Sequence, residues 1–490
     1  MMDYKKYLNA AWAMPLTYKV VGLIVLLLIF NPNSKIAAYL FLVVAGIGFL
    51  KFLFGENDNE TEEGFRRGSR LVPSNILINM INKTKKQSGA ILGSVPVLRE
   101  LEVLQFLFVG GMGTGKSLLL DLMYKSARER KHKAILIDLN GAALQKYYRP
   151  EIDVILNPFD ARSAKWSPLS EIEGDWQIDA LTKSFVADGE GSSSEWNGYA
   201  QNVVSTVIKS LLDAGRTSNA DLYQKLCIPD MDQLIELVAG TPAQNAITKD
   251  AKGMTASILS IVGSKFTSLR FLDKTSDKNN SFSIRKWMQN DDDSWIFINV
   301  KDDQLEALKP LIVAWIDISI SALLSSKPIA HDSDKRVWFF LDEMASLGRI
   351  QSINSLLTKA RKFGGVTVAG LQSISQLNSS YGMYDAQTLL ANFGNQVILR
   401  QNDSYTAEHF AKTLGSQEID RVIEGGSDGE KSSTSYSNQV TQQQIVLASQ
   451  LMTLPNRVGY LNLAGNWPVA KIQVQIPKPS KNVADSFIPK

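Results

Sequence analysis

Gly110-Gly111-Met112-Gly113-Thr114-Gly115-Lys116-Ser117 is the most informative stretch of the chain. It matches the P-loop pattern G-x-x-x-x-G-K-[ST], and it lies between an apolar run at 106–109 and a segment with helical spacing at 118–130. Glycines let backbone N–H groups wrap around phosphate oxygens, and the start of the helix favours anionic charge. Lys116 is expected to reach the β- and γ-phosphates of ATP, and the Ser117 hydroxyl to coordinate Mg²⁺. This context argues against a chance glycine turn.

Apolar runs of strand length alternate with helical segments on both sides of the P-loop. The runs lie at residues 103–109, 134–138, 152–156, 294–300, 337–341, 366–370 and 397–399. A strand–helix–strand alternation of this kind is typical of a parallel sheet covered by helices. The sequence therefore predicts an α/β fold with a parallel-rich central sheet.

The alternation is interrupted between residues 174 and 272, where helical stretches dominate, for example at 202–214, 231–238 and 251–269. We expect an all-α inserted domain at 174–290, between a first part (56–173) and a second part (291–490) of the nucleotide-binding domain. Residues 66–102 are expected to form short strands and turns. The Gly- and Ser-rich segment 425–437 is expected to be a mobile loop.

Two apolar runs at the start of the chain predict a membrane anchor. One is centred on residues 20–30 and reaches spanning length when it is extended back to residue 10; the other covers 36–54. A crossing needs about 20 mostly apolar residues, so residues 1–55 are expected to form a two-helix transmembrane hairpin. Lysines and arginines flank the outer ends, whereas the turn has only Lys35, which predicts that both termini are cytoplasmic. A cleaved signal peptide does not explain the second run.

The composition is that of a folded protein, with 44% apolar and 21% charged residues in a chain of 490. The formal net charge of +3 neither supports nor excludes binding to nucleic acid. Cys227 is the one cysteine, so no internal disulfide can form, and its helix-like surroundings predict a small buried hydrophobe. The three histidines are far apart and lack metal-ligand companions, so no zinc site is expected.

A pair of carboxylates, Asp342 and Glu343, directly follows the apolar run at 337–341. Ligands bind at the carboxyl ends of the strands in α/β sheets. Asp342 is expected to hold Mg²⁺ through water, and Glu343 to polarise the attacking water as a general base. Strands that end in two acids are common, and it is the combination with the P-loop that points to hydrolysis.

Arg361 and Gln372 are candidates for contact with the γ-phosphate. Arg361 lies on a helix-like stretch after the acidic pair, and it is a candidate arginine finger, which in ring motors comes from a neighbouring subunit. A solvated basic helix face explains its spacing equally well. Gln372 follows the run at 366–370 at the ligand edge of the sheet, where it is expected to sense the γ-phosphate or to cap the strand end.

Several longer motifs follow one another along the chain. They are GFRRGSRLV at 64–72, LRELE at 98–102, FLDEMASLG at 340–348, GLQSISQL at 370–377 and ANFGN at 391–395. Together with the N-terminal hairpin and the P-loop, they resemble the type IV secretion coupling proteins of bacterial conjugation, the TraD and TrwB family. The resemblance covers nearly the whole length, and motifs of this length in this order are much more specific than a P-loop alone.

The resemblance implies a homo-hexameric ring at the cytoplasmic face of the bacterial inner membrane, built from RecA-like nucleotide-binding domains with an inserted all-α domain. Arg361 and Gln372 are spaced after Asp342 and Glu343 in a way that is similar to the family's arginine finger and γ-phosphate sensor. The implied partners are a relaxase with single-stranded DNA, components of the secretion channel and the lipid bilayer; contact with double-stranded DNA stays open. The chain ends soon after residues 465–470 without a long acidic tail, so recognition of the relaxosome by that route is not expected.

The resemblance thus implies a DNA-stimulated ATPase that drives a relaxase–DNA complex towards a type IV secretion channel. One alternative is an FtsK-like pump for double-stranded DNA, although the additional membrane helices, long linker and winged helix of that family are not visible. Another is a docking receptor that selects protein substrates and uses ATP as an assembly switch. Lys301, Lys335 and Arg336 are candidate contacts to DNA phosphates, and each is also explained as part of a solvated face.

Overall fold

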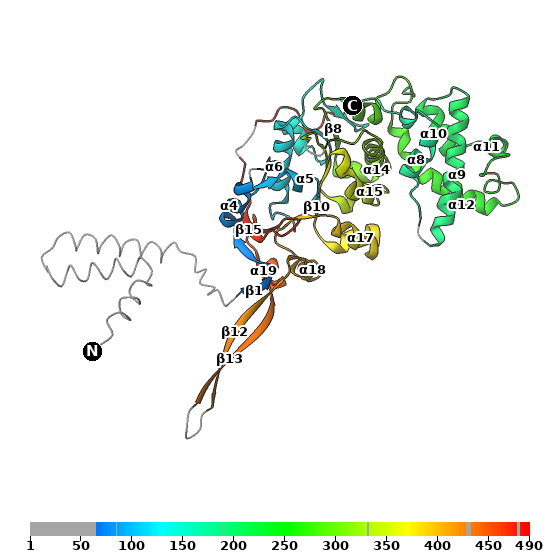
Figure 1. Cartoon of the computed structure of the whole chain (residues 1–490). Coiled ribbons are helices and arrows are strands. Elements are labelled where there is room, and N and C mark those ends of the chain that lie inside the picture. Colours follow the sequence, from blue (N-terminus) through cyan, green and yellow to red (C-terminus); the bar gives the residue numbers. More distant parts are fainter. Residues whose placement is uncertain (1–64, 85, 190, 331–332, 428–432, 478–480) are drawn as a thin grey trace, which may run out of the picture. The chain divides into compact units, whose positions relative to one another are not determined.

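The computed structural model describes residues 65–84, 86–189, 191–330, 333–427, 433–477 and 481–490 (Figure 1). These residues fall into two compact units. The larger unit comprises Arg66–Glu418 and Thr441–Lys490, and the smaller one includes residues 419–427 and 433–440. The predicted transmembrane hairpin at 1–55 and the acidic linker after it lie outside the described residues.

The central sheet has ten strands in the part of the chain that the structure describes. Its parallel portion runs in the order β11 (Asn395–Ile398), β5 (Phe106–Val109), β10 (Gly365–Leu371), β9 (Val337–Leu341), β6 (Lys133–Leu139), β8 (Trp295–Val300) and β7 (Val154–Ile155). Beyond β11 follow β14 (Val458–Asn462), antiparallel to both neighbours, then β15 (Val469–Gln473) and β2 (Leu71–Pro73). The predicted parallel-rich α/β sheet is confirmed, and its predicted strands match these bounds to within a few residues.

Both faces of the sheet are buried, which explains why its strands are continuous apolar runs rather than alternating ones. In β5, Leu107 and Val109 join one hydrophobic cluster, while Phe106 and Phe108 join the other. Helix α14 (Asp302–Leu324) contributes to the first cluster and helix α6 (Lys116–Glu129) to the second. The sheet is therefore a middle layer between two helical layers.

The other elements complete these layers. The remaining helices are α4 (Ser74–Thr84), α5 (Arg99–Glu102), α7 (Ala142–Tyr147), α8 (Trp176–Phe185), α9 (Ser192–Asp213), α10 (Asn219–Cys227), α11 (Met231–Val238), α12 (Lys252–Phe266), α13 (Ile284–Gln289), α15 (Ile353–Lys359), α16 (Ile374–Tyr381), α17 (Met383–Ala391), α18 (Ser404–Leu414) and α19 (Ala448–Thr453). Short 3-10 turns are η1 (Pro168–Glu171), η2 (Thr267–Phe271), η3 (Met344–Leu347) and η4 (Ala360–Phe363). Two small sheets pair β3 (Gln87–Leu92) with β4 (Val95–Leu98), and β1 (Phe65–Gly68) with β12 (Ser416–Ser427) and β13 (Ser433–Gln444).

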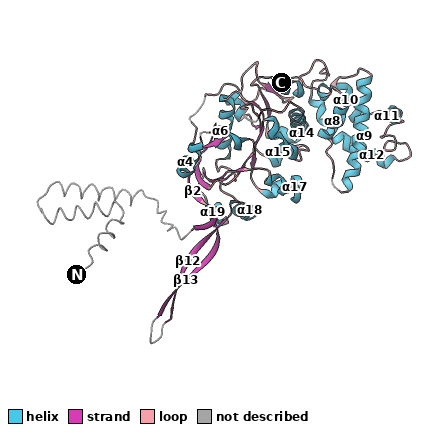
Figure 2. Cartoon of the chain, in the orientation of Figure 1, coloured by secondary structure: helices cyan, strands magenta, loops and turns pink. Residues whose placement is uncertain are grey.

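A helical block separates β7 from β8 in the chain. From α8 to α13, every regular element that the structure describes is a helix or a 3-10 turn (Figure 2). Figure 1 shows α8 to α12, in green, gathered at one side of the sheet, and α8 contacts α14. Cys227 ends α10 half-buried against the hydrophobic core, and burial raises the pKa of its thiol to about 11, which disfavours a nucleophilic thiolate.

Among the described helices, α14 is long and apolar enough to cross a membrane, with a mean hydropathy of 1.7 over its most apolar window. However, 67% of that window is buried inside the protein. Its apolar residues pack against the sheet and the neighbouring helices. Core burial therefore accounts for the hydropathy of α14.

Two predictions for local structure are wrong. Residues 66–102 contain helix α4 as well as short strands, because Leu77 and Ile81, one helical turn apart, both have to be buried in the core. This burial overrides the strand preference of the neighbouring isoleucines. Segment 425–437 is not a loop at its described ends, which belong to the paired strands β12 and β13. Pairing satisfies the polar backbone there without an apolar side-chain pattern.

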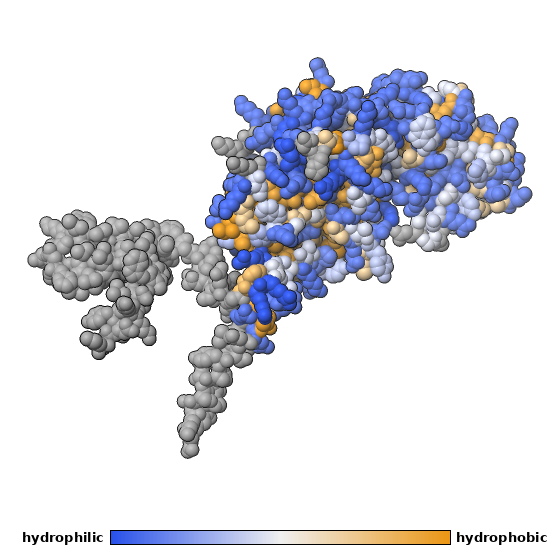
Figure 3. Space-filling model, in the orientation of Figure 1, coloured by the Kyte–Doolittle hydropathy of each residue, from blue (hydrophilic) through white to orange (hydrophobic). Residues whose placement is uncertain are grey.

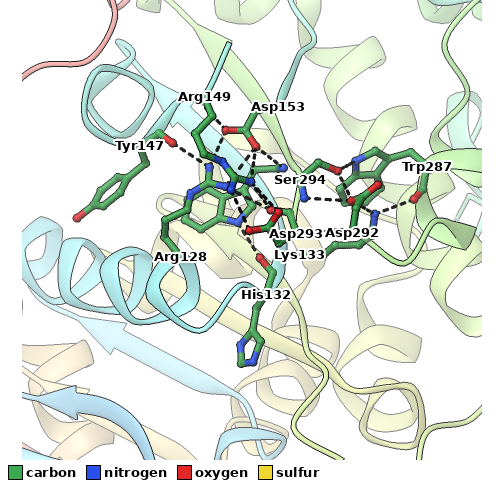
Figure 4. A network of polar contacts seen from close by, with 11 residues as sticks. Arg128, His132, Lys133, Tyr147, Arg149, Asp153, Trp287, Asp292, Asp293 and Ser294 are labelled. Carbon is green, nitrogen blue, oxygen red and sulfur yellow. Dashed lines mark hydrogen bonds and ion pairs between the residues drawn. The ribbon is translucent and has the colours of Figure 1, made fainter. Parts of the chain in front are cut away.

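A buried polar network joins α6 to the amino-terminal edge of the sheet (Figure 4). The Asp153 carboxylate accepts hydrogen bonds from Arg128 at 2.8 Å, from the Arg149 amide at 2.7 Å and from the Trp295 amide at 2.8 Å. Arg149 also donates to Asp293 at 2.8 Å, and the guanidinium of Arg128 lies 3.7 Å from the ring centroid of Trp295. These contacts fix α6 relative to β7 and β8, and the P-loop leads into the first turn of α6.

Candidate nucleotide-binding site

The P-loop joins the carboxyl end of β5 to the first turn of α6. Gly113 and Gly115 have φ angles of 72° and 113°, a region that favours glycine. Thr114 Oγ1 donates to the carbonyl of Gly111 at 2.8 Å, which closes the loop on itself. A Cβ atom on Gly113 would meet no other atom within 4 Å, so the space beside this glycine is open.

Neighbouring strands hold the base of the loop. The amide of Gly110 donates to the carbonyl of Leu371 at the end of β10, and the amide of Gly111 donates to the carbonyl of Arg400, both at 3.0 Å. Gly370 has no room for a side chain, because a Cβ atom would collide with the carbonyl of Asp342. The absence of that side chain lets the ends of β5, β10 and β9 converge.

The side chains of Lys116, Glu343 and Gln372 meet at this edge. Lys116 Nζ lies 3.1 Å from Glu343 Oε2, and Gln372 Nε2 donates to the same oxygen at 2.7 Å. The second carboxylate oxygen, Glu343 Oε1, is buried and has no hydrogen-bond partner among the described residues. A buried carboxylate oxygen with a free lone pair is suited to accept a proton from water.

Asp342 lies beside this cluster at the end of β9. Burial raises the pKa of its carboxyl, the positive charge of Lys116 lowers it, and the negative charge of Glu343 raises it further. Adjacent positive charge favours the ionised form of such a carboxyl, and a divalent cation would supply more of it. The pair of Asp342 with the exposed Ser117 hydroxyl is the hard oxygen donor set that Mg²⁺ prefers.

These groups line a cavity of about 520 Å³. Of the residues predicted for the site, those that line it are Gly111, Met112, Gly113, Gly115, Lys116, Ser117, Asp342, Glu343 and Gln372. Gly110 and Thr114 are buried, and the Thr114 hydroxyl supports the shape of the loop through its hydrogen bond to Gly111. With a lysine, backbone amides at a helix start and two carboxylates, the residues present fit a polyphosphate with a bound divalent cation.

Leu139, Asn456 and Arg457 also line the cavity, and none of them was predicted from the sequence. Leu139 ends β6, next to Asp138. The buried carboxylate of Asp138 accepts the amides of Ala143 and Leu144 at 3.1 and 2.6 Å, and burial raises its pKa to about 6. Asn456 and Arg457 come from the turn before β14, more than 300 residues from the P-loop. The turn signal Pro455-Asn456 marks a loop and does not reveal which site the loop faces.

Arg361 does not line the cavity. It is exposed on η4, which precedes β10, whereas Lys116 and Glu343 lie at the far end of that strand. A strand of the length of β10 separates its two ends by about 20 Å, so Arg361 cannot reach the γ-phosphate position of its own chain. The predicted contact of Arg361 with a γ-phosphate would therefore have to involve the nucleotide of another subunit.

The candidate DNA contacts are engaged within the chain. Lys301 Nζ lies 4.1 Å from the ring centroid of Phe487, and Lys335 pairs with Asp291 at 2.6 Å. The Arg336 side chain is 4% exposed and pairs with the buried Glu102 at 3.4 Å. Arg336 is therefore a structural residue, and both of its predicted roles, as a DNA contact and as part of a solvated face, are wrong.

The family model for the type IV secretion-system coupling protein DNA-binding domain matches residues 89–475, which include the whole site. The chain belongs to this family. The predicted membership of the coupling proteins and the predicted α/β P-loop NTPase fold are confirmed.

This coupling-protein chain is similar to known proteins over most of its length. It is 28% identical over 466 residues to the coupling protein TraD of Escherichia coli K12, which covers 93% of this chain but 64% of the relative. The chain thus spans less than two thirds of that relative. The plasmid coupling protein TrwB, solved with a non-hydrolysable ATP analogue, superposes with a TM-score of 0.79 at 31% identity, over 89% of this chain and 100% of that chain. TrwB solved with ADP and Mg²⁺ superposes with a TM-score of 0.76 over 86% and 96% of the two chains.

Proposed function

We propose that the chain is a membrane-anchored, ATP-driven motor that couples a relaxase–single-stranded DNA complex to a type IV secretion channel during conjugation. The observation that carries the proposal is the meeting of Lys116, Glu343 and Gln372 at a P-loop cavity, in a chain of the coupling-protein family. The names of the relatives, coupling protein TraD and conjugative coupling protein TrwB, support the conjugative role.

In this proposal, the P-loop amides and Lys116 bind the phosphates of ATP, and Ser117 and Asp342 hold Mg²⁺. The cation screens the phosphate charge when it is bound. Glu343 Oε1 takes the proton of the attacking water, and Gln372 orients Glu343 through its hydrogen bond and senses the γ-phosphate. The TrwB structures with an ATP analogue, a GTP analogue, and ADP with Mg²⁺ support binding of purine nucleotides with the metal.

Arg361 acts on the nucleotide of a neighbouring subunit in a homo-hexameric ring. Its place at the edge of the sheet opposite to its own P-loop supports this assignment, because a head-to-tail ring apposes such opposite edges. The guanidinium then stabilises the charge that develops on the γ-phosphate. Hydrolysis would depend on assembly of the ring.

The ring lies on the cytoplasmic side of the bacterial inner membrane, anchored by a two-helix hairpin at 1–55 with both termini in the cytoplasm. A RecA-like domain formed by 56–173 and 291–490 carries the nucleotide site, and an all-α domain at 174–290 faces the cytoplasm. The helical elements from α8 to α13 support that division. DNA binds in the ring through its phosphates, so binding is largely independent of sequence and weakens as salt is added.

The test is the ATPase rate of the full-length chain, reconstituted in lipid nanodiscs, with and without single- or double-stranded DNA. A motor is expected to hydrolyse ATP faster with single-stranded DNA, and Lys116→Ala should abolish both the basal and the stimulated rates. Stimulation by a protein substrate and by neither form of DNA would favour the docking receptor. Stimulation by double-stranded DNA alone would favour a pump of the FtsK kind.

A further inference from the structure

The turn before β14 brings Asn456 and Arg457 to the nucleotide cavity from the side opposite to Glu343. In the sheet, β9 lies two strands from β5 on one side, and β14 lies two strands from β5 on the other. Because β14 is antiparallel to β11, its first residues lie at the same edge as the carboxyl ends of the parallel strands. The P-loop therefore lies between Glu343 and Arg457.

The backbone of Arg457 is fixed against the P-loop. Its amide donates to the carbonyl of Thr114 at 2.8 Å, and its carbonyl accepts the amide of Val474 at 2.7 Å. A Cβ atom on Gly115 would lie 3.4 Å from Cα and Cγ of Arg457. Arg457 has a φ of 66°, which is unfavourable for a residue with a side chain and persists only where the surroundings enforce it.

The side chain of Arg457 is partly buried, and among the described residues it has no hydrogen-bond or ion-pair partner. The other cation at the cavity, Lys116, is paired with Glu343. Two arginines that serve the fold have acidic partners: Arg128 pairs with Asp153, and Arg130 pairs with Glu102. The guanidinium of Arg457 is thus a free, planar group at the wall of a ligand cavity.

The orientation of the nucleotide in the cavity indicates which part of it lies beside Asn456 and Arg457. The proposed function places the γ-phosphate beside Glu343 and Gln372, so the nucleoside extends to the other side of the P-loop, where Asn456 and Arg457 lie. We propose that Arg457 binds the nucleoside by stacking its guanidinium on the base, with the Asn456 side chain beside it; this assignment rests on the proposed function. Guanidinium groups stack well on aromatic rings, and stacking accepts either purine.

The conformation of Arg457 offers a variant that separates binding from stability. Arg457→Gly removes the side chain and relieves the unfavourable φ, so the thermal midpoint should not fall. The full-length chain in nanodiscs is titrated with ATP, GTP and inorganic tripolyphosphate, each with Mg²⁺. Arg457→Gly should weaken ATP and GTP by about 10-fold, the range of a lost stacking contact, and leave tripolyphosphate unchanged. Arg457→Lys, which keeps the charge without the planar group, should show the same pattern.

Arg270→Ala is the matched control, because Arg270 is exposed on η2 and does not line the cavity. It should bind all three ligands as the wild type does. If Arg457→Gly loses as much affinity for tripolyphosphate as for ATP, the guanidinium contacts the phosphates and the proposed base contact is wrong. Unchanged affinity for ATP would also contradict the base contact. A wild-type chain that binds neither ATP nor tripolyphosphate would instead refute the proposed function itself.

Discussion

Lys116 and Glu343 form an ion pair across β10, with Nζ of the lysine 3.1 Å from Oε2 of the glutamate. The P-loop cation and the proposed general base thus hold each other in place. A γ-phosphate that attracts Lys116 would weaken this ion pair. The Glu343 carboxylate would then keep its hydrogen bond from Gln372 and be open to water. In the proposed mechanism, this ion pair would link nucleotide binding at Lys116 to the hydrogen bonding of Glu343.

The first prediction concerns the base. Glu343→Gln keeps the size of the side chain and removes its ability to accept a proton, so ATP hydrolysis should fall by about 100-fold or more while nucleotide binding persists. Steady-state hydrolysis and equilibrium ATP binding on the same preparation measure the two effects. Glu129→Gln, which changes an exposed glutamate at the end of α6, should leave both unchanged. A Glu343→Gln chain that hydrolyses ATP at the wild-type rate would remove Glu343 from the mechanism.

Arg361 is predicted to act between subunits. Arg361→Ala and Lys116→Ala should each be inactive alone, because one lacks the finger and the other lacks the phosphate-binding lysine. In rings assembled from equal amounts of the two variants, about a quarter of the interfaces combine an intact Lys116 with an intact Arg361 from the neighbouring subunit. Mixing the two variants should therefore restore part of the activity. The measurement is the ATPase rate as a function of the mixing ratio. If no ratio restores hydrolysis, Arg361 does not act in trans.

The network around Asp153 is predicted to be a major source of stability. Asp153→Ala leaves Arg128 buried without its carboxylate partner, which should cost about 3 kcal/mol in the free energy of unfolding. Urea denaturation of the two proteins measures the difference. In Asp232→Ala, which breaks the exposed pair with Lys249, the unfolding midpoint should stay where it is. Equal unfolding midpoints for Asp153→Ala and the wild type would contradict the assigned role.

Asp138 is predicted to make stability depend on pH. Burial raises its pKa from 3.8 to about 6, so between these values the folded state binds more protons than the unfolded state. Protonation of Asp138 therefore stabilises the folded state at low pH, and this stabilisation is lost as the pH rises through about 6. Relative to Asp138→Asn, the wild type should lose about 1 kcal/mol of stability between pH 5 and pH 7. A difference between the two proteins that stays constant over this range would contradict the raised pKa.

The parts of the fold that follow from the sequence are those dictated by local pattern. Buried parallel strands require unbroken apolar runs, so residues 337–341 and 366–370 identify β9 and β10, and the P-loop glycines identify the turn between β5 and α6. Asp342, Glu343 and Gln372 follow such runs, so their convergence could be predicted from the parallel sheet alone.

Features set by distant packing could not be predicted. Arg457 reaches the P-loop because β14 inserts antiparallel beside β11, and no local pattern encodes that neighbour. Helix α4 contains strand-favouring isoleucines, and only the burial of Leu77 and Ile81 by the rest of the fold selects the helix. Arg336 looks like a surface charge until Glu102, far away in the sequence, is placed against it.

On the face shown in Figure 3, hydrophobic side chains lie in small groups among hydrophilic ones over the larger unit. Isolated exposed apolar residues are normal for folded proteins. The functional proposal therefore rests on the P-loop cavity.

The central claim, that hydrolysis at this cavity drives DNA transfer, is tested most directly by mating. Donor cells that carry Glu343→Gln in place of the wild-type chain should transfer DNA at least about 100-fold less often, in line with the loss of hydrolysis. Donors with Glu129→Gln should transfer normally, and immunoblots of the membrane fraction should show equal amounts of all three proteins. Transfer at the wild-type frequency by Glu343→Gln donors, with ATP hydrolysis abolished in the purified protein, would contradict the motor.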